Sequence, residues 1–221
     1  RVRRERMRRK TIRAATVRER SSENVGEAKR RKSGVAGRGQ LIVISGPSGA
    51  GKTSICNALL RELPDTVWSV SATTRPPRPG DRPGASYEFI SREEFARREA
   101  EGDFLESAEY VGHRYGTPRK PVEDALTAGK NVVLEIDVQG GMQVAAKMPE
   151  SVRVFVLPPD MDSLRARLEG RKSEAEEQLR RRLAKADGEI AIARDSGCYD
   201  YFVVNDVLEQ TIERVKQIVT R

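Results

Sequence analysis

The chain has 221 residues, enough to bury a substantial core, and its 41 Lys and Arg against 33 Asp and Glu give a formal net charge of +8. Residues 1–39 carry 15 Lys and Arg against four Asp and Glu, a net of +11, whereas the remaining 182 residues carry 26 against 29, a net of −3. The overall positive charge is therefore no evidence that residues 40–221 bind nucleic acid. No apolar stretch approaches the roughly 18 residues that span a membrane.

The N-terminal segment, residues 1–39, is rich in Arg, Ser and Gly and has few aliphatic residues. Because it offers little apolar surface to offset the entropy of ordering, we predict that it lacks stable structure on its own. Three interpretations stay open: a solvated tail (or an extended start of the reading frame) without a specific role, a contact for nucleic acid or an anionic surface, and a transit peptide that directs the chain to an organelle.

From Gln40 onward, short apolar runs alternate with segments of helical periodicity. Continuous Val, Ile and Leu runs predict strands that are buried on both faces, as in parallel sheets covered by helices. The predicted strands are residues 41–45, 66–70, 131–137, 152–157 and 201–204. The predicted helices are residues 52–62, one from Pro121 to Gly129, one capped by Asp160, and two with the apolar stripes Leu179, Leu183, Ala186, Ile190 and Leu208, Ile212, Val215, Val219. This order predicts an α/β fold with a five-stranded parallel sheet flanked by helices.

Two stretches interrupt that order. Residues 71–116 are polar, contain four prolines between Pro76 and Pro83, and are too long for an ordinary connection between a strand and a helix. We expect a small inserted domain above the carboxyl ends of the strands, where α/β proteins bind ligands. The charged residues 169–174 are typical of a lid between two helices.

The segment from Gly46 to Thr53 reads G-P-S-G-A-G-K-T and follows the first predicted strand directly. It matches the G-x-x-x-x-G-K-[ST] phosphate-binding loop in its usual context of strand, glycine-rich turn and helix. The glycines let successive N–H groups point at one anion, and the following helix adds its positive N-terminal end. Lys52 then reaches the β- and γ-phosphates of a nucleoside triphosphate, and the Thr53 hydroxyl coordinates Mg²⁺. The alternative is an ordinary glycine-rich turn.

Two arginines, Arg75 and Arg78, lie three residues apart in a proline-stiffened loop. Guanidinium groups pair with phosphate through two parallel hydrogen bonds, and proline lowers the entropic cost of holding them in place. The loop is therefore a candidate anion site, with an exposed Arg/Pro loop as the alternative. The two cysteines, Cys56 and Cys198, match no metal or redox spacing, so we expect reduced thiols in a cytoplasmic protein.

Taken together, these motifs resemble those of guanylate kinases over about residues 40–219. The matching segments are V-I-S-G-P-S-G-x-G-K-[ST] at 43–53, S-x-T-T-R-x-P-R-x-G-[DE] at 71–81, Y-E-F at 87–89, F-L-E at 104–106, Y-G-T at 115–117, E-I-D-V-Q-G at 135–140, R-L-E-G-R at 167–171 and V-N-D at 204–206. The resemblance implies a P-loop NTPase-type domain over residues 40–221. Its core would be 40–70, 118–160 and 183–221, its GMP-binding insertion 71–117, and its lid 161–182.

The resemblance implies transfer of the γ-phosphoryl group of MgATP to GMP or dGMP, giving ADP and GDP, in purine nucleotide metabolism. Two small departures are Glu135, where the family often has aspartate, and Lys172, where glycine is frequent. The implied ligands of the GMP phosphate are Ser71, Arg75, Arg78, Tyr87 and Tyr115. The implied guanine-binding residues are Glu106, Thr117 and Asp137. Carboxylates suit guanine because its N1–H and amino group are donors. The alternative for Glu106 and Asp137 is an ordinary acidic residue at the surface or at a strand end. For Asp137, a role behind the ligands of a metal also competes.

For the donor nucleotide, the resemblance implies binding by Gly46, Pro47, Ser48, Gly49, Ala50, Gly51, Lys52, Thr53, Ser54, Arg167 and Asn205. Lys52, Arg78, Arg171 and Arg182 would surround the transferred group, because the chemistry is mainly positioning and charge neutralisation. Asn205 would lie near the adenine or shape the lid, and the alternative for Arg182 is a solvated helix face. His113 is expected in an exposed turn. Two rival functions are a non-catalytic binding module with this fold and a phosphotransferase for another small phosphorylated acceptor. The sequence predicts no particular oligomeric state.

Overall fold

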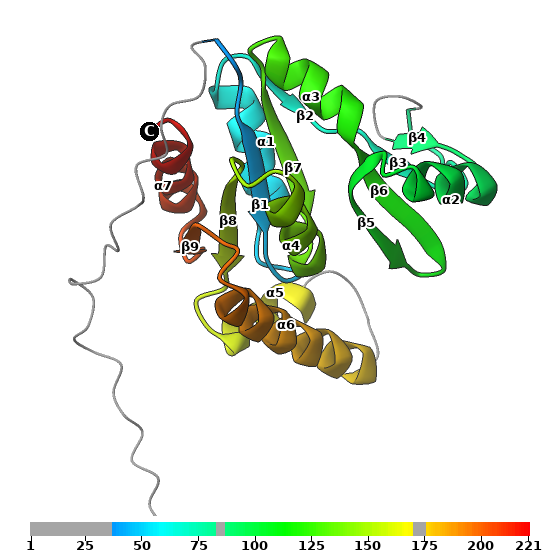
Figure 1. Ribbon diagram of the computed structural model, residues 1–221. Coiled ribbons are helices and arrows are strands. Elements are labelled where there is room, and N and C mark those ends of the chain that lie inside the picture. Colours follow the sequence, from blue (N-terminus) through cyan, green and yellow to red (C-terminus); the bar gives the residue numbers. More distant parts are fainter. Residues whose placement is uncertain (1–36, 83–86, 170–175) are drawn as a thin grey trace, which may run out of the picture. The chain divides into compact units, whose positions relative to one another are not determined.

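The computed structural model describes residues 37–82, 87–169 and 176–221 (Figure 1). The N-terminal segment up to residue 36, with its predicted anion contact or targeting role, lies outside these residues. So do residues 170–175, which include Arg171 and all but the first residue of the charged stretch 169–174. No helix among the described residues has the length and hydropathy that crossing a membrane requires.

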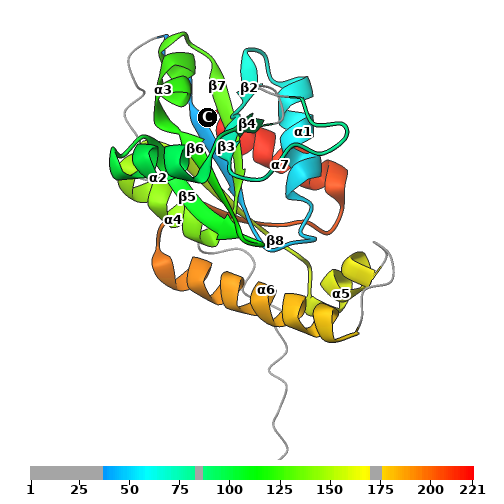
Figure 2. The same ribbon diagram turned by 90° about the vertical axis from the view of Figure 1, so that its right-hand side faces the viewer.

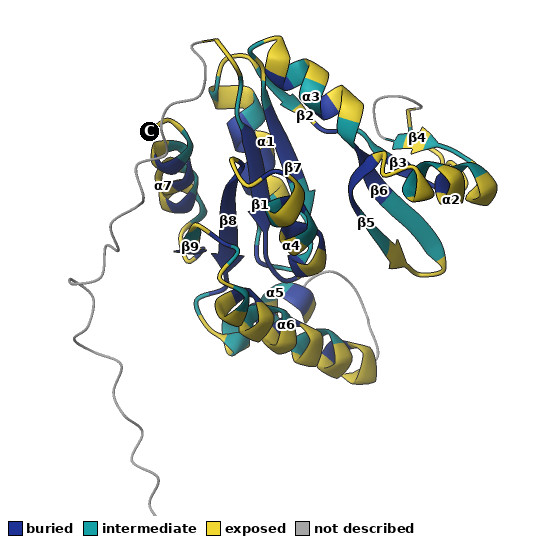
Figure 3. Ribbon diagram, in the orientation of Figure 1, coloured by how far each residue is buried: buried dark blue, intermediate teal, exposed yellow. Residues whose placement is uncertain are grey.

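Five parallel strands form the main sheet, in the order β2-β7-β1-β8-β9. Their bounds are β1 Leu41–Ser45, β2 Thr66–Trp68, β7 Asn131–Ile136, β8 Val152–Leu157 and β9 Tyr201–Val204. All five residues of β1 and all six of β8 are buried (Figure 3), as the continuous apolar runs predict. The predicted five-stranded parallel sheet is therefore confirmed.

Helices cover both faces of this sheet (Figure 2): α1 Lys52–Glu62 and α7 Leu208–Val219 on one side, α3 Arg119–Thr127 and α4 Val138–Lys147 on the other. Alternate residues of β1 face the two layers. Ile42 and Ile44 pack with side chains of α1 and α7, whereas Leu41 and Val43 pack with side chains of α3 and α4. The central strand therefore contributes to two separate halves of the core.

Three element boundaries differ from the sequence predictions. β2 ends at Trp68, two residues early, although the Ser69 N–H still donates to Val133 O at 3.1 Å. β7 ends at Ile136, because Asp137 caps α4. α3 begins at Arg119 rather than Pro121, since the first-turn N–H groups of a helix need no intrahelical partner and proline is tolerated there.

A second sheet of four strands occupies most of the stretch predicted to be an insertion. Its order is β4-β3-β6-β5, with β3 parallel to β4 and the other neighbours antiparallel. The bounds are β3 Ser71–Thr73, β4 Tyr87–Phe89, β5 Phe104–Tyr110 and β6 His113–Pro118. Helix α2, Arg92–Ala100, packs Phe95 against Phe104 with ring centroids 4.5 Å apart. The segment therefore has its own small apolar cluster.

Two further helices, α5 Met161–Glu169 and α6 Glu176–Ser196, pack together through leucines and alanine. The Ser163 N–H donates to Asp160 Oδ1 at 2.6 Å, which confirms the predicted cap of α5. In α7 all four residues of the predicted stripe pack against the core, Val215 buried and the other three partly buried, and Thr211 and Ile218 are buried beside them.

Candidate functional site

The phosphate-binding loop connects β1 to α1, and its glycines adopt conformations that other residues rarely take. Gly46, Gly49 and Gly51 have φ values of 147°, 87° and 96°. A Cβ at Gly46 would lie 2.4 Å from Val156 O, and one at Gly51 would lie 2.2 Å from Asn205 Nδ2. The loop therefore needs glycine both for its backbone conformation and for the space around it.

Lys52, the first residue of α1, folds back over the loop. Its Nζ donates to Gly46 O at 2.8 Å and to Pro47 O at 3.1 Å. Burial lowers the pKa of this amine, and the nearby Glu135 and Glu189 carboxylates oppose the shift. Glu189 of α6 is a neighbour that the sequence analysis missed, because nothing in a helical stripe identifies which residue faces a loop far away in the chain.

Thr53 donates its hydroxyl to Glu135 Oε1 at 3.0 Å. Hydroxyl and carboxylate oxygens are ligands that suit Mg²⁺, which typically takes one or two protein ligands and fills the rest with phosphate and water. Within the described ranges, no group of three or more His, Cys, Asp and Glu could hold a metal. The Thr53 hydroxyl and the Glu135 carboxylate beside it fit a nucleotide-bound Mg²⁺. The alternative role of Asp137 at the metal stays a prediction.

Helix α6 contacts the phosphate-binding loop through Arg182, which donates to Ser48 Oγ at 2.9 Å. Its neighbours Arg180 and Arg181 instead pair with Glu176 and Glu177, and their side chains are 71% and 76% exposed. Arg182 therefore does not belong to the solvated face of the helix.

Asn205, which follows β9, links the phosphate-binding loop to α5. Its Nδ2 donates to Ala50 O at 2.8 Å, and its backbone oxygen accepts from the Arg167 guanidinium at 2.8 Å. The side chain is buried, and its Oδ1 accepts no hydrogen bond from the described residues. A carbonyl oxygen can only accept, so the amide nitrogen must face Ala50 and Oδ1 must point elsewhere.

Ser54, which the resemblance also places at the donor nucleotide, is exposed in the first turn of α1.

A cavity of about 490 Å³ brings together most of the residues expected around the acceptor phosphate. Arg75 is buried, with its guanidinium 5.3 Å from the centre of the Tyr87 ring. Ser71 pairs with Tyr87 in the sheet but does not line the cavity. His113 is half-buried at the start of β6 and lines the cavity, so the expectation of an exposed turn was wrong. The lining residues are Arg75, Arg78, Tyr87, Tyr110, Val111, His113 and Tyr115.

Asp81 holds this arginine loop together and was not identified from the sequence. Its Oδ2 accepts from the Arg78 N–H at 2.7 Å and pairs with the Arg75 guanidinium at 2.9 Å. The hydrogen bond from Arg78 and the neighbouring charge of Arg75 lower the pKa of Asp81. The only signal was its place in the S-x-T-T-R-x-P-R-x-G-[DE] segment.

Glu106 of β5 is a buried carboxylate with 6% of its surface exposed. Its Oε1 accepts from Thr117 Oγ1 at 2.6 Å, across the β5–β6 pair. Burial raises the pKa of Glu106, and the Asp137 charge raises it further, against the hydrogen bond from Thr117. Asp137 Oδ1 accepts from the Gly140 N–H at 2.9 Å. The structure thus brings all three residues of the expected guanine site together, and Glu106 is not an ordinary surface acid.

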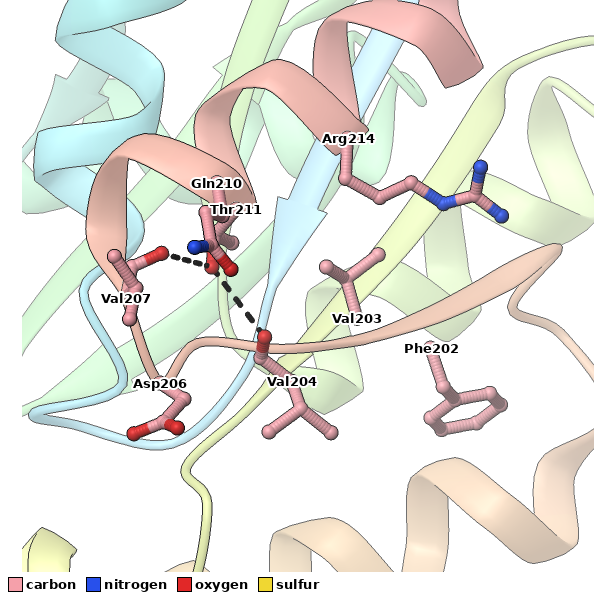
Figure 4. A pocket seen from close by; sticks show the side chains of 8 residues that line it. All are labelled: Phe202, Val203, Val204, Asp206, Val207, Gln210, Thr211 and Arg214. Carbon is pink, nitrogen blue, oxygen red and sulfur yellow. Dashed lines mark hydrogen bonds between the residues drawn. The ribbon is translucent and has the colours of Figure 1, made fainter. Parts of the chain in front are cut away.

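A second cavity, of about 270 Å³, lies between β9 and α7 (Figure 4). The Thr211 hydroxyl is already bonded to the carbonyls of Val204 and Val207, at 3.3 and 3.0 Å. Phe202 and Val204 leave part of the wall apolar and exposed on the edge strand β9. None of the residues expected to bind nucleotide lines this cavity.

Comparison with known proteins agrees with this arrangement. The family model for guanylate kinase matches residues 38–221. The guanylate kinase of Rubrobacter xylanophilus is 50% identical over 184 residues, which cover 83% of this chain and 95% of the relative. The guanylate kinase of Desulfitobacterium hafniense is 48% identical over 180 residues, which cover 81% of this chain and 88% of the relative. The crystal structure of guanylate kinase from Anaplasma phagocytophilum has a TM-score of 0.64 at 36% identity and covers 83% of this chain and 86% of its own. The chain belongs to the guanylate kinase family.

Proposed function

We propose that this protein transfers the γ-phosphoryl group of MgATP to GMP, giving ADP and GDP. The observation that carries the choice of acceptor is the buried Glu106 carboxylate beside Thr117 and Asp137. Guanine presents N1–H and an amino group as donors on its pairing edge, and a carboxylate can only accept. Adenine presents an acceptor at N1, which would face the carboxylate unfavourably. A site with buried polar partners can reject the wrong analogue by about 10⁴-fold or more.

On the donor side, we assign the phosphate-binding loop to the triphosphate of ATP. The Nζ of Lys52 already donates to two loop carbonyls, so it can exchange them for phosphate oxygens with little movement. Arg182 contributes a positive charge at Ser48. Asn205 belongs to this donor side because its Nδ2 donates to Ala50 O in the loop.

On the acceptor side, we assign Arg75 and Arg78 to the phosphate of GMP. This phosphate is already anionic near neutral pH, so its oxygen can attack without a general base. The difficulty is to bring two polyanions together, and catalysis consists mainly of positioning and charge neutralisation. The loop that Asp81 braces is suited to that task because the Arg75 guanidinium and the backbone of Arg78 are held in place before the substrate arrives.

We assign the metal to the Thr53 hydroxyl, with Glu135 beside it. When bound, Mg²⁺ would neutralise charge on the β- and γ-phosphates of ATP. The family membership supports a place in purine nucleotide metabolism, and we place the protein in the cytoplasm. The basic residues 1–39 add the separate prediction of an anion contact. Binding to nucleic acid that is lost on their deletion and weakens with salt would support it, and unchanged binding would contradict it.

The test is ADP formation from MgATP with GMP, dGMP, AMP, CMP and UMP in parallel, with Lys52→Met as the inactive control. We expect turnover with GMP far above that with AMP, CMP or UMP. Turnover with a different phosphorylated acceptor would favour the second kind of phosphotransferase. A folded protein that binds ATP but turns over no acceptor would favour the non-catalytic binding module.

A further inference from the structure

The side-chain amide of Gln143, in α4, binds both backbone groups of one residue in β5. Its Nε2 donates to Ser107 O at 3.0 Å, and its Oε1 accepts from the Ser107 N–H at 3.1 Å. The amide therefore gives the backbone N–H and C=O of Ser107 hydrogen-bond partners, as a neighbouring strand would. Ser107 directly follows Glu106, the carboxylate assigned to the guanine.

A second contact from the same helix lies on the other side of Glu106. Lys147 Nζ donates to Phe104 O at 2.8 Å. Between Phe104 and Glu106 the pairing of β5 with β6 shifts register. Such irregularities re-aim side chains and leave local backbone groups without their sheet partners. The two contacts from α4 thus bracket the place where β5 turns the Glu106 side chain inward.

Gly140, Gln143 and Lys147 are spaced i, i+3 and i+7 along α4 and therefore share one face of the helix. A Cβ at Gly140 would lie 3.1 Å from Glu106 Oε2, so the glycine leaves room for the carboxylate. The same helix begins at its cap, Asp137, which is the second carboxylate assigned to guanine. One helix therefore carries Asp137 and holds the backbone on both sides of Glu106.

We propose that Gln143 is a positioning residue for guanine recognition, because it fixes Glu106 relative to Asp137 through the backbone of Ser107. This inference rests on the proposed function and goes beyond it. Gln143 does not contact the nucleotide in this account. Its loss would let β5 drift from α4, so that the two carboxylates could no longer both reach the donors of one base. Misplacement of a site by about 1 Å can cost about 10²-fold.

The test compares the wild-type protein with Gln143→Met, which keeps the size of the side chain and removes both hydrogen bonds. Gln217→Met, at an exposed position of α7, is the matched control. We expect kcat/KM for GMP to fall about 10- to 100-fold with most of the change in KM, and KM for ATP to stay within about twofold. With IMP, which lacks the amino group of guanine, the fall should be smaller, so the ratio of GMP to IMP should drop.

A merely structural role would lower kcat/KM for both acceptors equally or raise KM for ATP in parallel, and either result would overturn the proposal. A double-mutant cycle adds a second criterion. In the Glu106→Ala background, Gln143→Met should change kcat/KM for GMP by less than about twofold, and a fully additive effect would contradict the inference. If the wild-type protein turns over no GMP, the proposed function fails. If the wild-type protein prefers GMP and Gln143→Met retains that preference in full, only the inference about Gln143 fails.

Discussion

The guanidinium of Arg182 donates a hydrogen bond to the Ser48 hydroxyl at 2.9 Å and joins two residues that lie 134 positions apart in the chain. The contact brings α6 against the phosphate-binding loop, where Lys52 also lies. Two positive groups from distant elements thus meet at the loop assigned to the triphosphate. Their roles can be separated by substitution.

We expect Arg182→Met to lower kcat for ADP formation by about 10³-fold, because a positive side chain at a transferring phosphoryl group contributes about 10³–10⁵ in rate. Arg180→Met is the matched control, since the Arg180 side chain is 71% exposed and pairs with Glu176 on the same helix. Steady-state kinetics with saturating ATP and GMP measures both. Equal, small effects of the two substitutions would show that Arg182 is only a surface residue.

Glu135→Gln should raise the Mg²⁺ concentration needed for half-maximal activity by about 10- to 100-fold, as expected when a residue that supports a metal ligand is altered. The reason is the contact between Glu135 Oε1 and the Thr53 hydroxyl. Asp137→Asn is the counterpart. It should preserve α4, because asparagine still caps a helix, and it should raise KM for GMP while leaving the Mg²⁺ dependence unchanged. Titration of Mg²⁺ and GMP with both variants is the measurement. A shift in Mg²⁺ dependence with Asp137→Asn alone would move the metal to Asp137.

Glu106→Gln should stabilise the fold at about pH 7.5 while impairing activity with GMP. Burial raises the pKa of Glu106 in the folded state above its value in the unfolded chain. Between these two values the native state retains a proton that the unfolded state has lost, so stability falls as the pH rises through this window. Above both values the buried charge destabilises the fold in full, and a neutral glutamine removes that cost.

We expect the free energy of unfolding of Glu106→Gln at about pH 7.5 to exceed that of the wild type by about 1 kcal/mol, in line with stabilising changes at functional sites. At about pH 3, well below the pKa of an unperturbed glutamate, the carboxyl group is protonated in both states and the gain should disappear. Urea unfolding at both pH values measures it, with Glu209→Gln at an exposed position of α7 as the control. A variant that is less stable than the wild type at both pH values would contradict the argument.

Gly51→Ala should destabilise the protein by about 1–3 kcal/mol, because its φ of 96° is strained for any other residue and the new Cβ would lie 2.2 Å from Asn205 Nδ2. Gly188→Ala, in the middle of α6, should instead stabilise by about 0.4–1 kcal/mol, since a Cβ there meets nothing within 4 Å. Thermal unfolding of the two variants tests both statements. The same sign for both substitutions would contradict them.

The core of the fold could be read from the sequence because its signals are local. Residues 41–45, 52–62, 152–157 and 201–204 have the predicted bounds, as each is a short apolar or periodic run between glycines, prolines or polar residues. The internal arrangement of the insertion could not be read in the same way. Its strands are short, and the parallel pairing of β3 with β4 depends on contacts across the sheet rather than on either segment alone.

The candidate site also has a part that the sequence predicts and a part that it does not. The phosphate-binding loop and the residues that belong to motifs were named from the sequence, and the structure brings Glu106, Thr117 and Asp137 together as expected. The partners of these residues were not predictable. Glu135 at Thr53 and Gln143 at Ser107 each depend on how helices and strands from distant parts of the chain pack. Pairing of side chains across the fold leaves no local signal.

The assignment of Glu106 to the guanine base is tested most directly by the ratio of kcat/KM for GMP to that for AMP, measured for the wild-type protein and for Glu106→Ala. We expect a wild-type ratio of about 10⁴ or more, since a buried carboxylate rejects the acceptor at N1 of adenine. We also expect Glu106→Ala to lower this ratio by at least about 10²-fold, mainly through the loss of activity with GMP. Comparable use of GMP and AMP by the wild-type protein, or a ratio that Glu106→Ala leaves unchanged, would contradict the assignment of Glu106 to the guanine base.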